Sequence, residues 1–151
     1  MPLLRAALSW NFVLATAVCA SLLAQLIKVL LNLFIFHRFI AERMWGAGGM
    51  PSSHSATVCA MVVATGRYCG VNSPIFAIAA VLSIIVMYDA MGVRYETGEQ
   101  AKVLNRLFTE WMDQGIEQFQ FPHGKKLKEM VGHTPIEVLT GAALGIVLGF
   151  V

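Results

Sequence analysis

Residues 75–86 read IFAIAAVLSIIV, the most continuous apolar stretch in the chain, with no charge before Asp89. The run follows the turn-forming residues 70–74, GVNSP, and predicts a membrane-spanning helix. The whole sequence points the same way, because 57% of its 151 residues are hydrophobic and only 13% are charged. An ordinary soluble domain is much less apolar. We therefore predict one all-α, membrane-embedded domain covering residues 1–151.

Three more apolar segments surround this run. Trp10–Ile27 has 18 residues, about 27 Å of helix, close to the roughly 30 Å hydrocarbon core. We interpret Lys28 as its polar end and Leu30–Phe36 as a helix leaving along the interface. Its apolar character continues past Ala20, which favours a retained first span over a cleaved leader. The other two segments are Ser55–Gly66, which forms a hairpin with residues 75–86, and Pro135–Val151.

The region from Gly92 to Thr134 is polar, but apolar residues recur along it at helical spacing. This pattern predicts an amphipathic helix that ends at residues 121–124, FPHG. Because its polar face carries both signs of charge, packing on the bundle is favoured over lying in the membrane interface. The apolar positions are Leu104, Leu107, Phe108, Trp111, Met112, Ile116 and Phe119.

Small and sulfur-containing residues have packing roles in this interpretation. Gly141, Gly145 and Gly149 recur every four residues, a stripe that lets helices approach closely in lipid. Whether the chain also forms a homo-oligomer is left open. The three cysteines show neither disulfide nor metal-ligand spacing, and we expect them to be small buried residues.

The basic residues fall unevenly on the two sides of the predicted bundle. With four spans, Arg5 and Arg67 lie on one side and nine Lys and Arg residues on the other. The positive-inside rule makes the richer side cytoplasmic. The cations are not gathered in a basic run, so nucleic acid is not an expected partner. The nine are Lys28, Arg38, Arg43, Arg94, Lys102, Arg106, Lys125, Lys126 and Lys128.

The same topology brings polar residues from distant parts of the chain to the cytoplasmic side. Helix starts offer hydroxyls and free N–H groups to an anion, with the positive end of the helix dipole behind them. The predicted site is therefore an anion site, with phosphate as its expected guest. The converging residues are Lys28, Ser52, Ser53, His54, Asp89, Arg94 and His133.

Each part of this site has a simpler explanation when it is taken alone. Ser52 or Ser53 is a good N-cap, and Asp89 could simply pair with Arg94. Thr134, Pro135 and Glu137 form a capping-box pattern, although Glu137, four residues after His133, could instead orient the imidazole. A metal site of His54, His133 and Glu137 is disfavoured because no H-E-x-x-H or cysteine pair supports it.

Three blocks of sequence, GGMPSSHSA (48–56), YDAMGVR (88–94) and GHTPIEV (132–138), together resemble a known family. They are similar to the divergent branch of the superfamily of type 2 phosphatidic acid phosphatases and vanadium haloperoxidases. The blocks stand in the family's order and extend the likeness over nearly the whole chain.

The resemblance assigns roles to residues of the first and third blocks and leaves the roles of Asp89 and Arg94 in the second block open. His133 would be the nucleophile that forms a phosphohistidine, Glu137 its orienting carboxylate and His54 the general acid. Ser53 stands where the superfamily motif has glycine, and the superfamily's Arg-Pro pair is missing. The implied phosphate-binding residues are Ser52, Ser53, Lys28, Arg94 and Lys128, with Arg38, Arg43 and Asp89 as further candidates.

The resemblance implies a membrane-bound phosphatase that hydrolyses a lipid phosphate or diphosphate on the cytoplasmic face. It needs no dissolved cofactor, and vanadate is expected to inhibit it. One alternative is a catalytically impaired protein that keeps the fold as a binding or assembly module. Another is a vanadate-dependent oxidation enzyme, which the small size of the chain disfavours.

Overall fold

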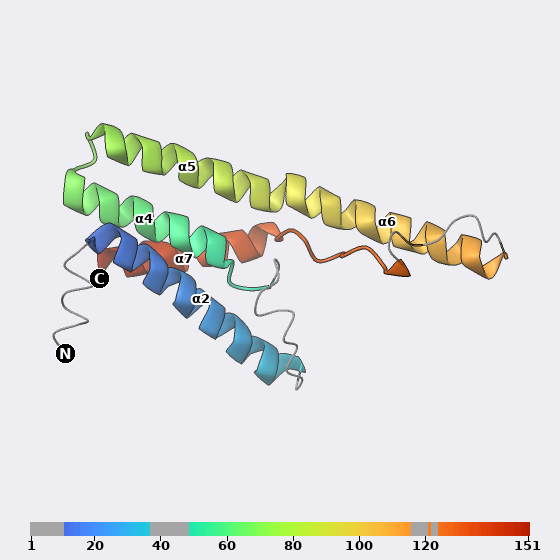
Figure 1. Ribbon diagram of the computed structural model, residues 1–151. Helices are drawn as coiled ribbons and strands as arrows, with labels where there is room; N and C mark the ends of the chain where they lie inside the picture. The colour runs from blue at the N-terminus through green and yellow to red at the C-terminus, as the bar shows by residue number, and fades with distance from the viewer. Residues whose placement is uncertain (1–10, 37–48, 116–120, 122–123) are drawn as a thin grey trace.

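The computed structural model describes residues 11–36, 49–115, 121 and 124–151. Over these residues the chain is helical and contains no β-strand. The helices are α2 (Phe12–Phe36), α4 (Ser53–Cys69), α5 (Pro74–Met91), α6 (Val93–Asp113) and α7 (Pro135–Phe150). Figure 1 shows α2, α4, α5 and α7 gathered in one bundle, with α6 extending away from it. The predicted all-α membrane-type bundle is confirmed.

Helix α4 is the centre of the bundle, because it packs against α7, α2 and α5. Its core residues are small: Ala56 and Ala60 are fully buried against Ala20 and Ala24 of α2. Alanines bury little area themselves, but they let the helix axes come close, and close packing is what holds helices together in lipid.

The glycine stripe of α7 faces α4 at this closest approach. A Cβ atom at Gly141 would overlap the backbone of Ser52, and one at Gly145 would overlap the backbone of Ala56. Gly149 packs in the same way against Val63. All three glycines are buried inside the chain. The glycine stripe is thus buried in the contact between α4 and α7. Any homo-oligomer would have to form through another surface.

The outer surfaces of the bundle are apolar, as expected for contact with hydrocarbon. Phe12–Phe34 and the continuous helical stretch Pro74–Asp113 are each long and apolar enough to contain a membrane span, and Pro135–Phe150 is a shorter apolar helix. The exposed apolar side chains include Leu22, Leu26 and Phe34 of α2, Ile78, Ile84 and Ile85 of α5, and Leu139, Val147 and Phe150 of α7.

The ends of the spans differ from the sequence-based expectation at Lys28. Helix α2 continues through this residue to Phe36, so Lys28 is not the polar end of the span and Leu30–Phe36 is not a separate interfacial helix. The prediction was wrong because it assumed that the Lys28 ammonium group lies in water at the membrane surface. Instead the Lys28 side chain turns into the protein, where only 1% of the residue is exposed.

Arg67, at the other end of α4, does not keep this helix out of the bundle. Its Nη1 donates to the carbonyl oxygen of Gly149 at 2.9 Å, and its guanidinium lies 5.8 Å from the centre of the Phe12 ring. A cation at the last carbonyls of α7 also complements that helix's dipole. The cysteines are free thiols, but only Cys59 is buried, contrary to the expectation for Cys19 and Cys69.

The amphipathic helix α6 follows α5 almost in line, with only Gly92 between them (Figure 1). Among the described helices it contacts α5 alone, so the expected packing on the bundle is wrong. It ends at Asp113, earlier than predicted, because Gly115 adopts a left-handed conformation (φ 75°) just after the cap at Gln114. Phe121 packs on Phe108 of its apolar face. The predicted positions Ile116 and Phe119 lie outside the described residues.

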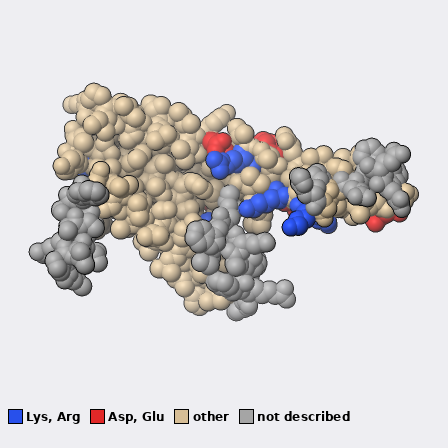
Figure 2. All heavy atoms as spheres, in the orientation of Figure 1, with Lys and Arg blue, Asp and Glu red and all other residues tan. Residues whose placement is uncertain are grey.

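Residues 124–134, which we call the connector, run back along α6 to the bundle. The amide of Asn105 holds the connector: Nδ2 donates to the Leu127 carbonyl (2.9 Å) and to Glu129 Oε1 (2.8 Å), while Oδ1 accepts from the Leu127 N–H (2.8 Å). Further along, Gly98 and Gly132 allow direct backbone contact between α6 and the connector. Figure 2 shows lysines and arginines gathered along this arm, while the visible bundle surface is nearly free of charge.

Candidate anion site at the helix starts

The start of α4 forms the first wall of the site. Ser52 is fully buried, and its Oγ caps the helix by accepting from the Ser55 N–H at 3.4 Å. Its own N–H donates to the Glu137 carbonyl oxygen at 2.9 Å, which fixes the start of α4 against α7. The N–H groups of Ser53 and His54 are the first two of the helix and have no carbonyl four residues earlier to bind. The Ser52 N–H is therefore already occupied, and the Ser53 and His54 N–H groups are the remaining candidates for the predicted anion.

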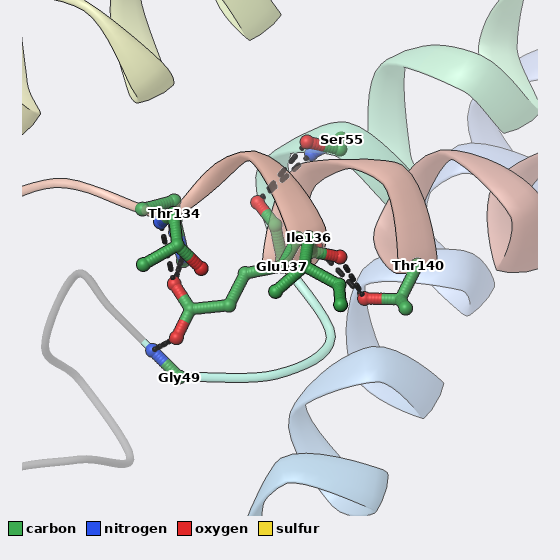
Figure 3. A network of polar contacts seen from close by, with 8 residues as sticks. Gly49, Ser55, Thr134, Ile136, Glu137 and Thr140 are labelled. Carbon is green, nitrogen blue, oxygen red and sulfur yellow. Dashed lines mark hydrogen bonds and ion pairs between the residues drawn. The ribbon is translucent and has the colours of Figure 1, made fainter.

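Glu137, in the first turn of α7, is the centre of a polar network (Figure 3). Its Oε2 accepts from the Thr134 N–H at 3.0 Å and lies 3.1 Å from His133 Nδ1. Its Oε1 accepts from the Gly49 N–H at 3.2 Å. The two sequence-based interpretations of Glu137 are therefore compatible, since one carboxylate both closes the helix cap and holds the imidazole.

His133 is held by two contacts and is 2% exposed. Its backbone N–H donates to the Ala90 carbonyl oxygen at 3.0 Å, and its Nδ1 faces Glu137. A neutral histidine whose Nδ1 donates to a carboxylate carries its lone pair on Nε2. That Nε2 atom is buried and has no hydrogen-bond partner among the described residues. The arrangement thus leaves one oriented, unpaired nitrogen inside the site.

His54 lies beside His133, with ring centroids 6.0 Å apart and the rings inclined by 67°. Unlike His133 it is exposed, so it can exchange protons with solvent. Lys28, Asp89 and Arg94 are also near enough to interact electrostatically with the His54 imidazole. The site therefore combines a buried histidine, an exposed histidine and two cations.

Lys28 reaches the site through a close contact with Gly49. The glycine has φ 89°, a left-handed conformation that side chains disfavour, and a Cβ atom there would lie 3.3 Å from Lys28 Cδ. Gly49 thus lets the loop before α4 pass over the lysine stem while its N–H reaches Glu137. Lys28 also interacts electrostatically with Glu137, which offsets part of the cost of burying an ammonium group.

The other predicted residues are placed less centrally. Arg94 Nε pairs with Asp89 Oδ2 at 2.5 Å at the border of the site, with both side chains partly exposed. Lys128 is exposed on the connector beside Leu127, the residue held by Asn105. Asn105 lies three turns of α6 beyond Arg94, roughly 16 Å along the helix, so Lys128 is not among the gathered cations. Arg38 and Arg43 lie outside the described residues.

Sequence reasoning missed two residues that shape the site. Gln25 of α2 points its Nε2 at Ser53 Oγ, 3.5 Å away. Asn105 fixes the connector that carries His133. Gln25 could have been recognised from the sequence, because it is a polar amide inside an apolar run. Asn105 could not, because no neighbouring sequence feature indicates its role. Among the described residues, no group of three or more His, Cys, Asp or Glu side chains is arranged to hold a metal ion.

The fold is that of an all-helical membrane protein in which the starts of α4 and α7 bring histidines and serines together beside Lys28 of α2. Residues 9–148 match the model of the Divergent PAP2 family, and the chain belongs to that family. It is 40% identical over 147 residues to the uncharacterized membrane protein YuiD of Bacillus subtilis (strain 168), and the match covers 93% of each chain. No solved structure matches the chain.

Proposed function

We propose that this protein is a membrane-bound phosphatase that hydrolyses a lipid phosphate or lipid diphosphate through a phosphohistidine on His133. The observation that carries the proposal is the state of the His133 ring: Nδ1 contacts Glu137, and Nε2 is buried, has no hydrogen-bond partner among the residues that the structure describes, and lies on a ring next to His54. A nucleophile oriented by a carboxylate and adjacent to a second acid–base group is the arrangement that covalent catalysis requires.

The first half of the reaction forms the phosphoenzyme. His133 Nε2 attacks phosphorus and forms a P–N bond while the bond from phosphorus to the lipid oxygen breaks. Protonated His54 gives its proton to that oxygen, so the lipid leaves as an alcohol, or as a monophosphate if the substrate is a diphosphate. Lys28 and the N–H groups of Ser53 and His54 would stabilise the negative charge on the other phosphate oxygens.

The second half restores the enzyme. His54, now neutral, takes a proton from a water molecule whose oxygen attacks phosphorus, and the P–N bond breaks to release inorganic phosphate. The Glu137 carboxylate would stabilise the positive imidazole ring in the intermediate. No dissolved cofactor takes part in these steps. Vanadate, a mimic of the five-coordinate phosphoryl group, is expected to inhibit the enzyme.

We place the site on the cytoplasmic face. The cations that the structure describes support this orientation, because only Arg67 lies at the far end of α4 while the others lie near the site or along the arm. A site at the membrane surface suits a lipid whose tail stays in the bilayer. A cysteine introduced at Lys125 should react with impermeant reagents only when the cytoplasmic side is accessible. Labelling from outside intact cells would overturn the orientation.

Phosphate release by the purified protein in detergent, measured over a panel of lipid phosphates, tests the function. The wild type should release phosphate and form an acid-labile phosphoenzyme, whereas His133→Ala should do neither. His54→Ala should slow release about 10²- to 10⁴-fold, the usual contribution of a general acid. Lys126→Ala, an exposed position on the connector, is the control. Phosphate release by His133→Ala at the wild-type rate would refute the mechanism.

A binding or assembly module is the second candidate function. It is favoured by the salt bridge that occupies Arg94 and by the position of Lys128 outside the site. Such a module would bind phosphate or vanadate, seen as thermal stabilisation, but would release no phosphate from any lipid in the panel.

A further inference from the structure

The bundle contains a groove at the end opposite the candidate anion site. Helix α4 lies between α2 and α5 (Figure 1), and among the described helices α2 and α5 each contact α4 but not one another. The groove has a volume of about 330 Å³ and is lined by all three helices. Met61, on its α4 side, lies seven residues after His54, or roughly 10 Å along the helix. The groove is therefore separate from the anion site.

The chemistry of the lining favours a hydrocarbon occupant. Leu14 and Ala17 of α2, Met61 of α4 and Ile75 of α5 present apolar atoms to the groove. The Thr65 hydroxyl is turned to its own helix, where it donates to the Met61 carbonyl oxygen at 2.7 Å. Water in this part of the groove would find few of the two to four polar partners that it needs. Hydrocarbon would gain dispersion contacts with three helices.

Continuity with the bilayer-facing surface identifies the source of the hydrocarbon. Leu14 and Ile75, on opposite sides of the groove, are both exposed and belong to the apolar outer surface of the bundle. A lipid chain can therefore enter from the side. A partner helix fits less well, since one helical turn with its side chains occupies roughly 420–610 Å³, from a pitch of about 5.4 Å and a diameter of about 10–12 Å. Such a helix could lie over the groove but could not fill it.

Polar groups stand at one end of the groove, where α2 begins and α4 ends. Asn11 Oδ1 accepts from the Leu14 N–H at 3.0 Å, which leaves the NH₂ group of this exposed residue to donate. Tyr68 is exposed beside it on the lining, and its hydroxyl can both donate and accept. Tyrosine is enriched at the headgroup level of membranes. These groups suit the ester and phosphate oxygens of a phospholipid whose chain lies in the apolar part.

We propose that this groove binds one acyl chain of a membrane phospholipid from the leaflet away from the anion site, with the lipid's polar part at Asn11 and Tyr68. The bound chain bridges α2 and α5, which do not touch each other, and so stabilises the bundle. The lipid is a structural ligand and not a substrate. The inference therefore does not depend on the proposed enzymatic function.

Photo-crosslinking locates the bound chain. A phospholipid that carries a diazirine in one acyl chain is added to the purified protein in detergent, and the labelled residues are mapped by mass spectrometry. Labelling should concentrate on Leu14, Met61 and Ile75, saturate, and be displaced by unlabelled phospholipid. Unsaturable labelling spread evenly over the exposed faces of α2, α5 and α7 would overturn the proposal. Absence of label from the groove, as expected if a partner helix covered it, would also overturn it.

Variants that narrow the groove test its effect on stability. Leu14→Trp places a larger ring on the groove, and Leu22→Trp, at a similarly exposed position of α2 outside it (65% against 60%), is the matched control. Added phospholipid should raise the unfolding temperature of wild type and Leu22→Trp, whereas Leu14→Trp should lose this stabilisation and the saturable labelling. Ala17→Phe fills the groove from a second position and should show the same losses. If phospholipid stabilises Leu14→Trp as much as wild type, the groove holds no specific chain.

Discussion

Replacing Glu137 by glutamine removes the charge from the centre of the network while keeping its shape. The carboxylate accepts three hydrogen bonds, two at Oε2 from Thr134 and His133 and one at Oε1 from Gly49. An amide has one acceptor oxygen, so Glu137→Gln can keep the two bonds at Oε2 but must turn an NH₂ group toward the Gly49 N–H. One donor loses its acceptor, which costs about 1–3 kcal/mol. Since the Glu137 side chain is 20% exposed, the lower half of this range is expected.

The effect on catalysis should be larger than the effect on stability. A glutamine oxygen can still orient His133 Nδ1, but it cannot balance the positive ring of the phosphohistidine. We expect kcat to fall about 10²- to 10⁴-fold, as for neutral replacements of a carboxylate that supports a catalytic histidine. The substrate KM should change little, because Glu137 does not contact the phosphate in the proposed mechanism.

Thermal unfolding in detergent and steady-state phosphate release check the two effects separately. Glu110→Gln is the matched control, because Glu110 is an exposed glutamate that pairs with Arg106 on α6. Glu137→Asp should keep the charge but lose reach, so its stability should fall while its activity stays above that of Glu137→Gln. The reasoning would be refuted if Glu137→Gln kept kcat within about threefold of wild type while His133→Ala was inactive.

Three further predictions follow from the packing and the charges. Gly145→Ala should destabilise the bundle by about 1–3 kcal/mol, seen as a lower unfolding temperature, because its Cβ would meet the Ala56 backbone. An unchanged unfolding temperature would contradict the close packing of α7 on α4. Asn105→Ala should speed hydrogen exchange at the Leu127 N–H and lower kcat, and unchanged exchange would contradict its role in holding the connector. Lys28→Met should weaken vanadate inhibition about 10- to 100-fold, because the anion loses a charge-assisted hydrogen bond. The unfolding temperature should not fall, because the substitution also removes the cost of burying a charge. Unaltered inhibition would exclude Lys28 from the anion site.

Much of the bundle could be predicted because its signals are local. The run at residues 75–86 became α5, and the turn at residues 70–74 separates it from α4 as expected. Thr134 and Glu137 mark the start of α7 through a capping box that lies within four residues. Hydropathy and capping residues act over one or two helical turns, so the sequence displays them directly.

The features that could not be predicted depend on contacts between distant residues. Lys28 looks like the end of a span by hydropathy, because only the loop at Gly49 and the carboxylate of Glu137 provide a place for its side chain inside the protein. The amphipathic pattern of α6 indicates an apolar face but not what covers it. Asn105 has no sequence signature, since its partners lie more than twenty residues away.

Several residues of the predicted site lie together in the structure, although each also has a simpler local explanation. Ser52 is a helix cap, as the simpler explanation held, and Asp89 does pair with Arg94. Yet the same caps place His133 beside His54, because the start of α7 is bound to the start of α4 through the Ser52 N–H. The contacts that cap the helices are thus the same ones that bring the two histidines together, so the local explanations and the predicted site are compatible.

The connector is held at two points, one on α6 and one at the end of α5. It is fastened to α6 at Leu127 and to the end of α5 by the bond from His133 to Ala90. Ala90 and Asn105 are fifteen residues apart, or roughly 22 Å of helix if α5 and α6 are in line. The six residue steps from Leu127 to His133 span at most about 20–22 Å when fully extended. A single deletion in this segment should therefore shift the imidazole relative to Glu137, whereas changes of length near Gly124 should leave it in place.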